Sequence, residues 1–146
     1  MKIAIGSDHA GYGSPEPYKP ALQAHIEGLG HEVIDCGTDS DTSVDYPDFA
    51  DKVTETILAG KAERGILICG TGIGISIAAN RQPGIRAATC ATEDMARLAR
   101  EHNDANVICV GQRILSLEEC IKLVDIWLET PFSEGERHQR RVSKMD

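Results

Sequence analysis

A cysteine followed by closely spaced glycines is the clearest chemical signal in the sequence. Residues 66–81 read ILICGTGIGISIAANR, so Cys69 ends an apolar run and glycines follow at positions 70, 72 and 74. Glycines let the backbone approach a ligand closely, and successive N–H groups can form a nest that holds an anion. A helix predicted to begin near Gly74 would direct its positive end to the same point.

These surroundings predict chemistry for the thiol of Cys69. A field of this kind lowers the pKa of a thiol and makes thiolate available near neutral pH. The alternative is that Cys69 only packs, which is the commoner role of a cysteine at the end of an apolar strand. The nest beside it favours the chemical role over packing.

The spacing of the glycines excludes three familiar loops. A dinucleotide fingerprint fails from Gly70 and from Gly72, because its sixth position is Ile75 in one case and Ile77 in the other. A Walker loop fails because no Gly-Lys-Ser/Thr follows. A cysteine phosphatase, by analogy, would carry an arginine six residues after Cys69, where the sequence has isoleucine.

Other polar residues that could contact a ligand lie at the ends of predicted strands and on predicted helices: Asp8, His9, His102, Asn103, Arg113, Arg137 and Arg141. The last two are four residues apart and share one helix face, where paired guanidiniums suit a phosphate group. Each residue also has a structural alternative. Asp8 could cap a turn, His102 and Asn103 could end a helix, and the arginines could be solvated.

Composition limits the class of protein. The chain has 146 residues, which suits one domain over 1–146, and a net charge of −8, which argues against general nucleic-acid binding. Its five cysteines include no C-x-x-C pair, which argues against a disulfide framework and a structural zinc site. We expect no signal peptide and no membrane span, and therefore a cytoplasmic protein.

Short apolar runs alternate with helical patterns along the whole chain. Strands are predicted at 2–7, 32–36, 65–69, 85–90 and 107–111, and helices at about 20–28, 47–59, 93–102, 117–130 and 136–146. Ser116 and Glu119 form a capping box, and Met95, Leu98 and Ala99 are expected to face inward. This order predicts an α/β fold, a parallel sheet with helices on both faces, whose ligands bind beyond the carboxyl ends of the strands.

Six blocks of the sequence together resemble ribose-5-phosphate isomerase type B, in the family that also contains galactose- and allose-6-phosphate isomerases. The blocks are GSDHAG, DYPDFA, ILICGTGIGISIAANR, GIRAA, HNDANV and ERHQRRV, in order along nearly the whole chain. The resemblance implies a Rossmann-like three-layer α/β/α sandwich with a five-stranded parallel sheet. It also implies aldose–ketose isomerisation through an enediol without metal or cofactor, in homodimers or tetramers whose active sites are shared between subunits.

The resemblance also assigns roles to residues. It makes Cys69 the base that moves a proton between C1 and C2, and His102 the acid that opens the sugar ring. It implies substrate contacts by Asp8, His9, Tyr46, Gly70, Thr71, Gly72, Ile73, Gly74, Asn103, Arg113, Arg137 and Arg141, the three arginines holding the phosphate. Some relatives carry a glutamate beyond the glycines, so this chain resembles the cysteine branch. Residues 12–20 are longer and richer in proline than in the family, and we expect them to border the sugar pocket.

Three other functions remain open at this level. The same reaction could act on a six-carbon sugar phosphate. The chain could be a sugar-phosphate sensor that binds without turnover, or a flavodoxin-like nucleotide-binding module. Cys69 and His102 favour an enzyme over a sensor, because binding alone needs no base, and the failed fingerprints count against the nucleotide module.

Overall fold

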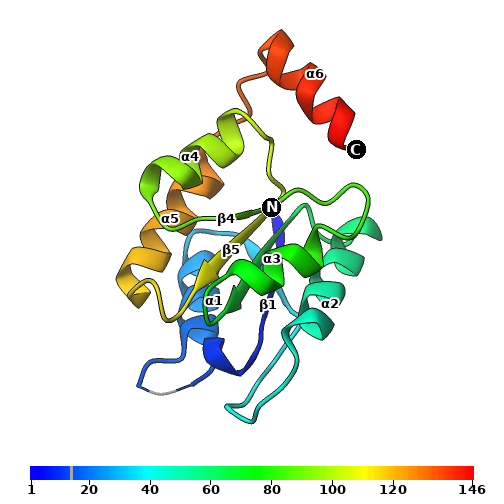
Figure 1. Ribbon diagram of the computed structural model, residues 1–146. Coiled ribbons are helices and arrows are strands. Elements are labelled where there is room, and N and C mark those ends of the chain that lie inside the picture. The colour runs from blue at the N-terminus through cyan, green and yellow to red at the C-terminus, as the bar shows by residue number, and fades with distance from the viewer. Residues whose placement is uncertain (14) are drawn as a thin grey trace.

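Five parallel strands form one sheet (Figure 1). Their order in the sheet is β2-β1-β3-β5-β4. The computed structural model describes residues 1–13 and 15–146. The strands are β1 (Lys2–Ser7), β2 (Glu32–Asp35), β3 (Arg64–Cys69), β4 (Ala87–Thr89) and β5 (Val107–Gly111). The central strand is β3, so Cys69 ends the middle of the sheet, with β1 on one side and β5 on the other.

Helices cover both faces of this sheet, which confirms the predicted three-layer sandwich. On one face pack α1 (Tyr18–Gly28), α4 (Glu93–Glu101) and α5 (Leu117–Glu129), and on the other α2 (Tyr46–Leu58) and α3 (Ile73–Ala79). Successive strand residues point to opposite faces. Ile66 and Ile68 therefore join the core under α1, α4 and α5, whereas Leu67 and Cys69 join the core under α2 and α3.

The predicted caps set the helix boundaries. Thr92 accepts the Met95 N–H at 3.2 Å at the start of α4, and Ser116 and Glu119 form the complete capping box of α5. That helix is capped by Thr130, the residue before Pro131, as expected. The last helix, α6 (Glu136–Met145), begins where the sequence predicted. No helix in the described part of the chain is long and apolar enough to cross a membrane.

Two predicted boundaries were wrong. Helix α1 begins at Tyr18 and not near residue 20, because Pro20 falls in the first turn, where its missing N–H costs no hydrogen bond. Strand β4 is shorter than the predicted 85–90. The Arg86 N–H donates to the Asn106 side chain at 2.8 Å, and Asn80 bonds both backbone groups of Ala87 at the edge of the sheet.

Two residues of the segment 12–20, Tyr18 and Lys19, are buried, and the segment does not form the wall of the predicted sugar pocket. Tyr18 is buried and its hydroxyl donates to the Leu115 carbonyl at 2.7 Å. Lys19 is also buried and its ammonium lies 2.6 Å from the Asp35 carboxylate. Apart from Ser14, which lies outside the described residues, none of this segment lines the hollow around Cys69, so this expectation was wrong. Met95, expected to face inward, is 42% exposed.

Candidate active site

The strand register brings three loops to one edge of the sheet. Ser7 pairs with Ile68, and Cys69 pairs with Gly111, so β1, β3 and β5 end side by side. The Asp8 N–H donates to the carbonyl of Ile68 at 3.1 Å, and the Arg113 N–H donates to the carbonyl of Gly70 at 2.8 Å. These backbone bonds join the loops that follow the three strands into one surface.

A hollow of about 430 Å³ opens at this edge, and most of the predicted site residues line it. Its walls are Asp8, His9, Ala10, Tyr46, Cys69, Gly70, Thr71, Ile73, Gly74 and Arg113. Residue 10 was not predicted, and its N–H donates to the Asp8 carboxylate at 2.9 Å. The side chains come from the ends of β1, β3 and β5 and the start of α2, as expected for a ligand site in a parallel sheet.

The sulfur of Cys69 accepts a hydrogen bond from the backbone of the glycine loop. The Gly72 N–H donates to the Cys69 Sγ at 3.1 Å. Gly72 has a φ of 79°, in the left-handed region that glycine adopts without strain, and this turn aims its N–H back at the sulfur. The N–H groups of Gly70, Thr71 and Gly74 have no hydrogen-bond partner among the described residues. The loop therefore offers free donors beside the sulfur, as the sequence predicted.

Tyr46 lies directly against the start of α3. A Cβ added at Gly74 would be 2.7 Å from the Cζ of Tyr46, closer than side chains tolerate. Glycine at this position therefore lets the aromatic ring of α2 close one side of the hollow. Tyr46 is 39% exposed and lines the hollow, so it is accessible to a ligand there.

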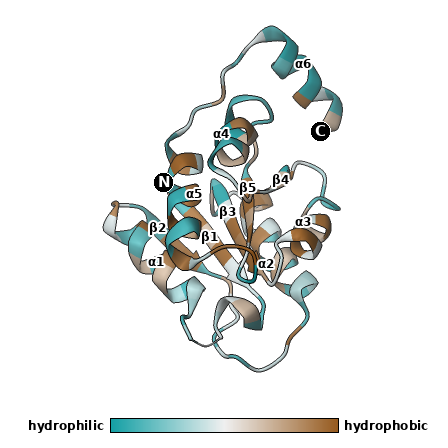
Figure 2. Ribbon diagram, turned by 60° about the vertical axis from the view of Figure 1, so that its left-hand side comes forward, coloured by the Kyte–Doolittle hydropathy of each residue, from teal (hydrophilic) through white to brown (hydrophobic). Residues whose placement is uncertain are grey.

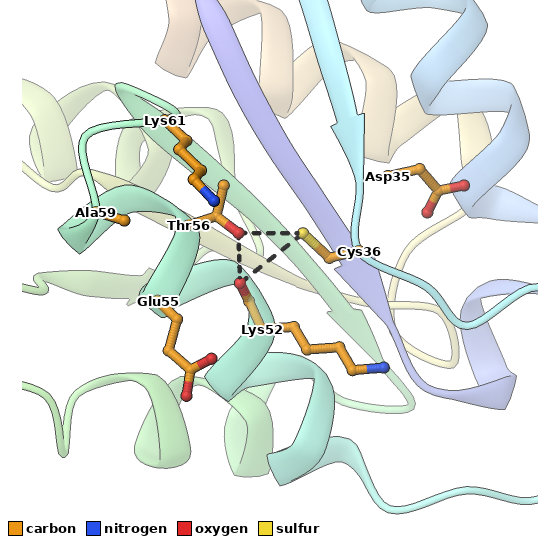
Figure 3. Close-up of a pocket in the computed structure, with 7 residues that line it drawn as sticks. All are labelled: Asp35, Cys36, Lys52, Glu55, Thr56, Ala59 and Lys61. Atoms are coloured by element: carbon orange, nitrogen blue, oxygen red, sulfur yellow. Dashed lines mark hydrogen bonds between the residues drawn. The ribbon is translucent and has the colours of Figure 1, made fainter.

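A second hollow, of about 520 Å³, also contains a cysteine, and its chemistry is different (Figure 3). The Sγ of Cys36 lies 3.9 Å from the carbonyl of Lys52 and 3.7 Å from the hydroxyl of Thr56, both on α2. A carbonyl only accepts hydrogen bonds, so this contact requires the protonated thiol. Burial also raises the pKa of Cys36. This cysteine stays a thiol, whereas the sulfur of Cys69 accepts a hydrogen bond.

The three remaining cysteines are core residues. Burial raises the pKa of Cys90 and of Cys120 to about 12, and raises the pKa of the fully buried Cys109 well above its ordinary value. All five cysteines are free, and only Cys69 lines the hollow at the carboxyl edge. Among the described residues, no three His, Cys, Asp or Glu side chains come together as a group that could hold a metal ion.

Asp8 is the charged group most strongly affected by burial in the hollow. It is 6% exposed, and this burial raises the pKa of its carboxyl. The Ala10 N–H and the nearby His9 and Arg113 act in the opposite direction, but burial is the larger influence. The ionised form of Asp8 therefore costs the folded protein stability.

Asp8→Asn should be at least as stable as the wild type at pH 7. A raised carboxyl pKa in the folded state means that stability is lost as pH rises from the ordinary value of 3.8 through the folded value. Asparagine removes this cost and can still accept the Ala10 N–H. Urea unfolding should show the advantage at pH 7 and its disappearance below pH 3.8, with exposed Asp51→Asn as the control. An Asp8→Asn protein that is less stable at pH 7 would contradict this.

Five predicted residues do not line the hollow. Gly72 is one of them, although its N–H donates to the Cys69 Sγ. The other four are His102, Asn103, Arg137 and Arg141. The ring of His102 stacks on His138 of α6, with centroids 4.3 Å apart and planes 10° from parallel. Asn103 lines a separate hollow of about 400 Å³, which Arg86 and Met145 also line. Asn103 was also a candidate for the left-handed residue that ends α4, but that residue is Asp104, with a φ of 46°.

Helix α6 stands apart from the sheet and carries the two predicted phosphate-binding arginines (Figure 1). Arg137 and Arg141 are exposed and form no ion pair with any described residue. His138, between them, is buried, and its pKa is lowered by burial and by the nearby His102 and the two arginines. Within one chain the predicted site residues therefore form two groups. The Cys69 group consists of the residues at the hollow, and the His102 group consists of His102, Asn103, Arg137 and Arg141.

Besides Ala10, sequence reasoning missed two residues that touch the predicted site. His138 stacks on His102, and a buried histidine in a charged helix left no signal of that contact. Val44 donates its backbone N–H to the Nδ1 of His9 at 3.1 Å. Every non-proline residue has such an N–H, so residue type could not have indicated this contact.

The fold and the hollow define a parallel α/β protein whose carboxyl sheet edge has the chemistry to accommodate a small anionic ligand. Free N–H donors and an arginine with no ion pair among the described residues meet there, next to a buried sulfur. The chain belongs to the Ribose/Galactose Isomerase family, whose sequence profile matches residues 3–145.

Individual relatives are similar over almost their whole length. The ribose-5-phosphate isomerase B of Escherichia coli K12 is 48% identical over 141 residues, which are 97% of this chain and 91% of the relative. The solved ribose-5-phosphate isomerase B of Clostridium thermocellum is 52% identical, with a TM-score of 0.94 over 99% of this chain and 95% of that one. The Thermotoga maritima structure is 51% identical, with a TM-score of 0.94 over 100% and 97%.

Proposed function

We propose that the protein interconverts ribose 5-phosphate and ribulose 5-phosphate through an enediol, with Cys69 as the base. One observation carries the proposal: the Cys69 sulfur lines the hollow and accepts a backbone N–H, while its neighbours offer further free donors. Membership of the Ribose/Galactose Isomerase family supports it, as do the relatives named ribose-5-phosphate isomerase B.

In the proposed reaction the Cys69 thiolate removes the proton from C2 of the open-chain aldose. The electrons of the broken C–H bond form the C1–C2 double bond, and the carbonyl oxygen at C1 takes the negative charge. The thiol then returns the proton to C1, while the hydroxyl proton moves from O2 to O1 and a carbonyl forms at C2. No atom is gained or lost, so the reaction needs no co-reactant.

Backbone donors stabilise the charge that develops on oxygen. Removing one preorganised donor to a developing oxyanion costs ~2.7–4 kcal/mol in an acyl-transfer enzyme, which shows the size that such an interaction can reach. The free N–H groups of Gly70, Thr71 and Gly74 are available for this role in the hollow. They are fixed by the backbone, so little reorganisation is needed when the charge appears.

The proposal divides the phosphate-binding and ring-opening groups between two subunits. Arg113 lines the hollow of its own chain, whereas His102, Asn103, Arg137 and Arg141 do not, and in the proposal these four reach the hollow of a partner. Helix α3 is mostly hydrophobic (Figure 2) and presents Ile73 and Ile77 on one face, 56% and 59% exposed. Exposed apolar side chains beside a site favour its being covered by a protein partner. A homodimer is therefore the smallest proposed active unit, with a tetramer as a pair of dimers.

Two further features belong to the proposal. The reaction takes place in the cytoplasm, where five unpaired cysteines stay reduced. The protein uses no cofactor, because the base, the oxyanion donors and the phosphate ligands are all groups of the chain. His102 in this scheme donates a proton to the ring oxygen, since only the open-chain sugar can isomerise.

The decisive experiment compares sugar phosphates as substrates of the purified protein. Ribose 5-phosphate should be converted to ribulose 5-phosphate with a higher kcat/KM than allose 6-phosphate or galactose 6-phosphate. A higher value for either six-carbon sugar would replace the substrate in the proposal. Binding of ribose 5-phosphate without turnover would instead identify a sensor and reject the enzyme.

A further inference from the structure

The imidazole of His9 accepts a hydrogen bond from the protein backbone. His9 lines the hollow that contains Cys69, and its Nδ1 lies 3.1 Å from the backbone nitrogen of Val44. A backbone N–H can only donate, so Nδ1 must be the acceptor in this hydrogen bond. The contact therefore fixes the protonation of the ring as well as its position.

We infer that the Val44 amide fixes His9 as the neutral Nε2–H tautomer, so that His9 donates a hydrogen bond to a substrate oxygen and is not a base. A neutral imidazole carries one proton, and an Nδ1 that accepts leaves that proton on Nε2. Nε2 is then the only polar ring atom left for a ligand in the hollow. The substrate half of this inference rests on the proposed function, whereas the tautomer does not.

The segment that carries Val44 is anchored at both ends. On one side it follows β2, where the Ser7 N–H donates to the carbonyl of Gly37 at 2.7 Å and the Thr38 N–H donates to the carbonyl of Ser7 at 2.8 Å. On the other side Asp45 is the N-cap of α2. The Val44 amide is thus positioned by the sheet and by a helix, which favours a fixed hydrogen bond over a chance contact.

The inference distinguishes between two candidates for the base. Cys69 and His9 line the same hollow, and either could in principle remove a proton next to a carbonyl. An imidazole that acted as a base through Nε2 would have to carry its proton on Nδ1. The Nδ1–H of His9 and the N–H of Val44 would then be two donors facing each other, with no acceptor between them. His9 is therefore a positioning and polarising donor, and proton abstraction is left to Cys69.

Nitrogen NMR of the free protein tests the tautomer directly. Long-range ¹H–¹⁵N spectra of the imidazole rings, recorded well above the histidine pKa, should show His9 as the Nε2–H form alone. The His9→Gln spectrum identifies its signals among those of the five histidines. An Nδ1–H form, or the rapidly averaged mixture of an unconstrained ring, would overturn the inference.

A matched pair of variants tests the role of the amide. Val44→Pro removes the N–H and should leave His9 as a mixture of tautomers, whereas Val44→Ala keeps the N–H and should keep the Nε2–H form. A pure Nε2–H form in a folded Val44→Pro protein would show that Val44 does not set the tautomer. If the proline variant does not fold, the wild-type spectrum still decides the tautomer.

Two substitutions of His9 separate a donor at Nε2 from a base. The amide of glutamine can place an N–H near the position of Nε2, whereas that of asparagine reaches only the position of Nδ1. His9→Gln should retain about tenfold more kcat/KM than His9→Asn, which corresponds to ~1.4 kcal/mol, the size of one hydrogen bond. Equal losses in both variants would overturn the donor role.

The tautomer of His9 and the proposed enzymatic function can be rejected independently of each other. If the wild type does not isomerise any sugar phosphate, the proposed function fails, but the ring spectrum still reports the tautomer. Binding of ribose 5-phosphate can then replace kcat/KM in the comparison of glutamine with asparagine. If the enzyme is active and the ring is Nδ1–H, only the assignment of His9 fails.

Discussion

Cys69→Ser should lower kcat/KM for ribose 5-phosphate by at least ~100-fold, the low end of what a general base contributes. Serine keeps the shape of the side chain but replaces a thiol of ordinary pKa ~8.5 by a hydroxyl that hardly ionises at neutral pH. The Gly72 N–H donates to the Sγ of Cys69, at the hollow where the proposed reaction takes place. Serine at this place can accept the same hydrogen bond but cannot remove a carbon-bound proton at a useful rate.

Cys36→Ser is the matched control for this substitution. Both cysteines lie at the carboxyl ends of strands and both line a hollow, but Cys36 contacts the carbonyl of Lys52, which requires a protonated thiol, and burial raises its pKa. The control variant should keep wild-type kcat/KM. Iodoacetamide should inactivate the wild type and the Cys36→Ser protein alike, and ribose 5-phosphate should slow both reactions.

Exchange of the C2 hydrogen with solvent separates loss of the base from loss of folding. This exchange reports proton abstraction directly and should disappear in Cys69→Ser in parallel with turnover. Circular dichroism and the affinity for inorganic phosphate should be unchanged, since neither depends on the sulfur. A folded Cys69→Ser protein with near-normal turnover would falsify the assignment and return Cys69 to a packing role.

The layers of the fold could be predicted because they depend on local patterns. Apolar runs such as 65–69 and 107–111 fix the buried strands, and the Ser116–Glu119 capping box fixes a helix start. The ends of the strands were less predictable, because they depend on contacts between residues that are distant in the sequence. Strand β4 is limited by the side chains of Asn80 and Asn106, which approach it from other loops.

Contacts in the candidate site were likewise predictable where the residues are close in the sequence and not where they are distant. The Cys69 group is predictable because a strand end, a glycine loop and a helix start are adjacent in sequence and remain adjacent in space. The contact of Val44 with His9 could not be predicted, since it uses a backbone amide 35 residues away. Exposed apolar residues such as Met95 and Ile73 contradict simple helix patterns, which is expected if a partner covers them.

Hybrid dimers test whether the His102 group and the Cys69 group act across subunits. A Cys69→Ser chain lacks the proposed base, and an Arg137→Ala/Arg141→Ala chain lacks two proposed contacts to phosphate, each worth ~1.5–3 kcal/mol when the partner is charged. Each variant expressed alone should therefore lose at least ~100-fold in kcat/KM. The arginine variant should stay folded, because both side chains are exposed and form no ion pair with any described residue.

Co-expression of the two chains with different tags allows the hybrid to be purified through both. If each site takes Cys69 from one chain and the arginines from the other, a hybrid dimer contains one site with both defects and one site with neither. The hybrid should then recover about half of the wild-type turnover with a wild-type KM for ribose 5-phosphate, although both parent proteins are nearly inactive. If each site is built within one chain, every site of the hybrid carries a defect, and activity stays at the level of the parents. Inactive hybrids that elute as dimers would therefore reject the shared site and require α6 to fold back onto its own hollow.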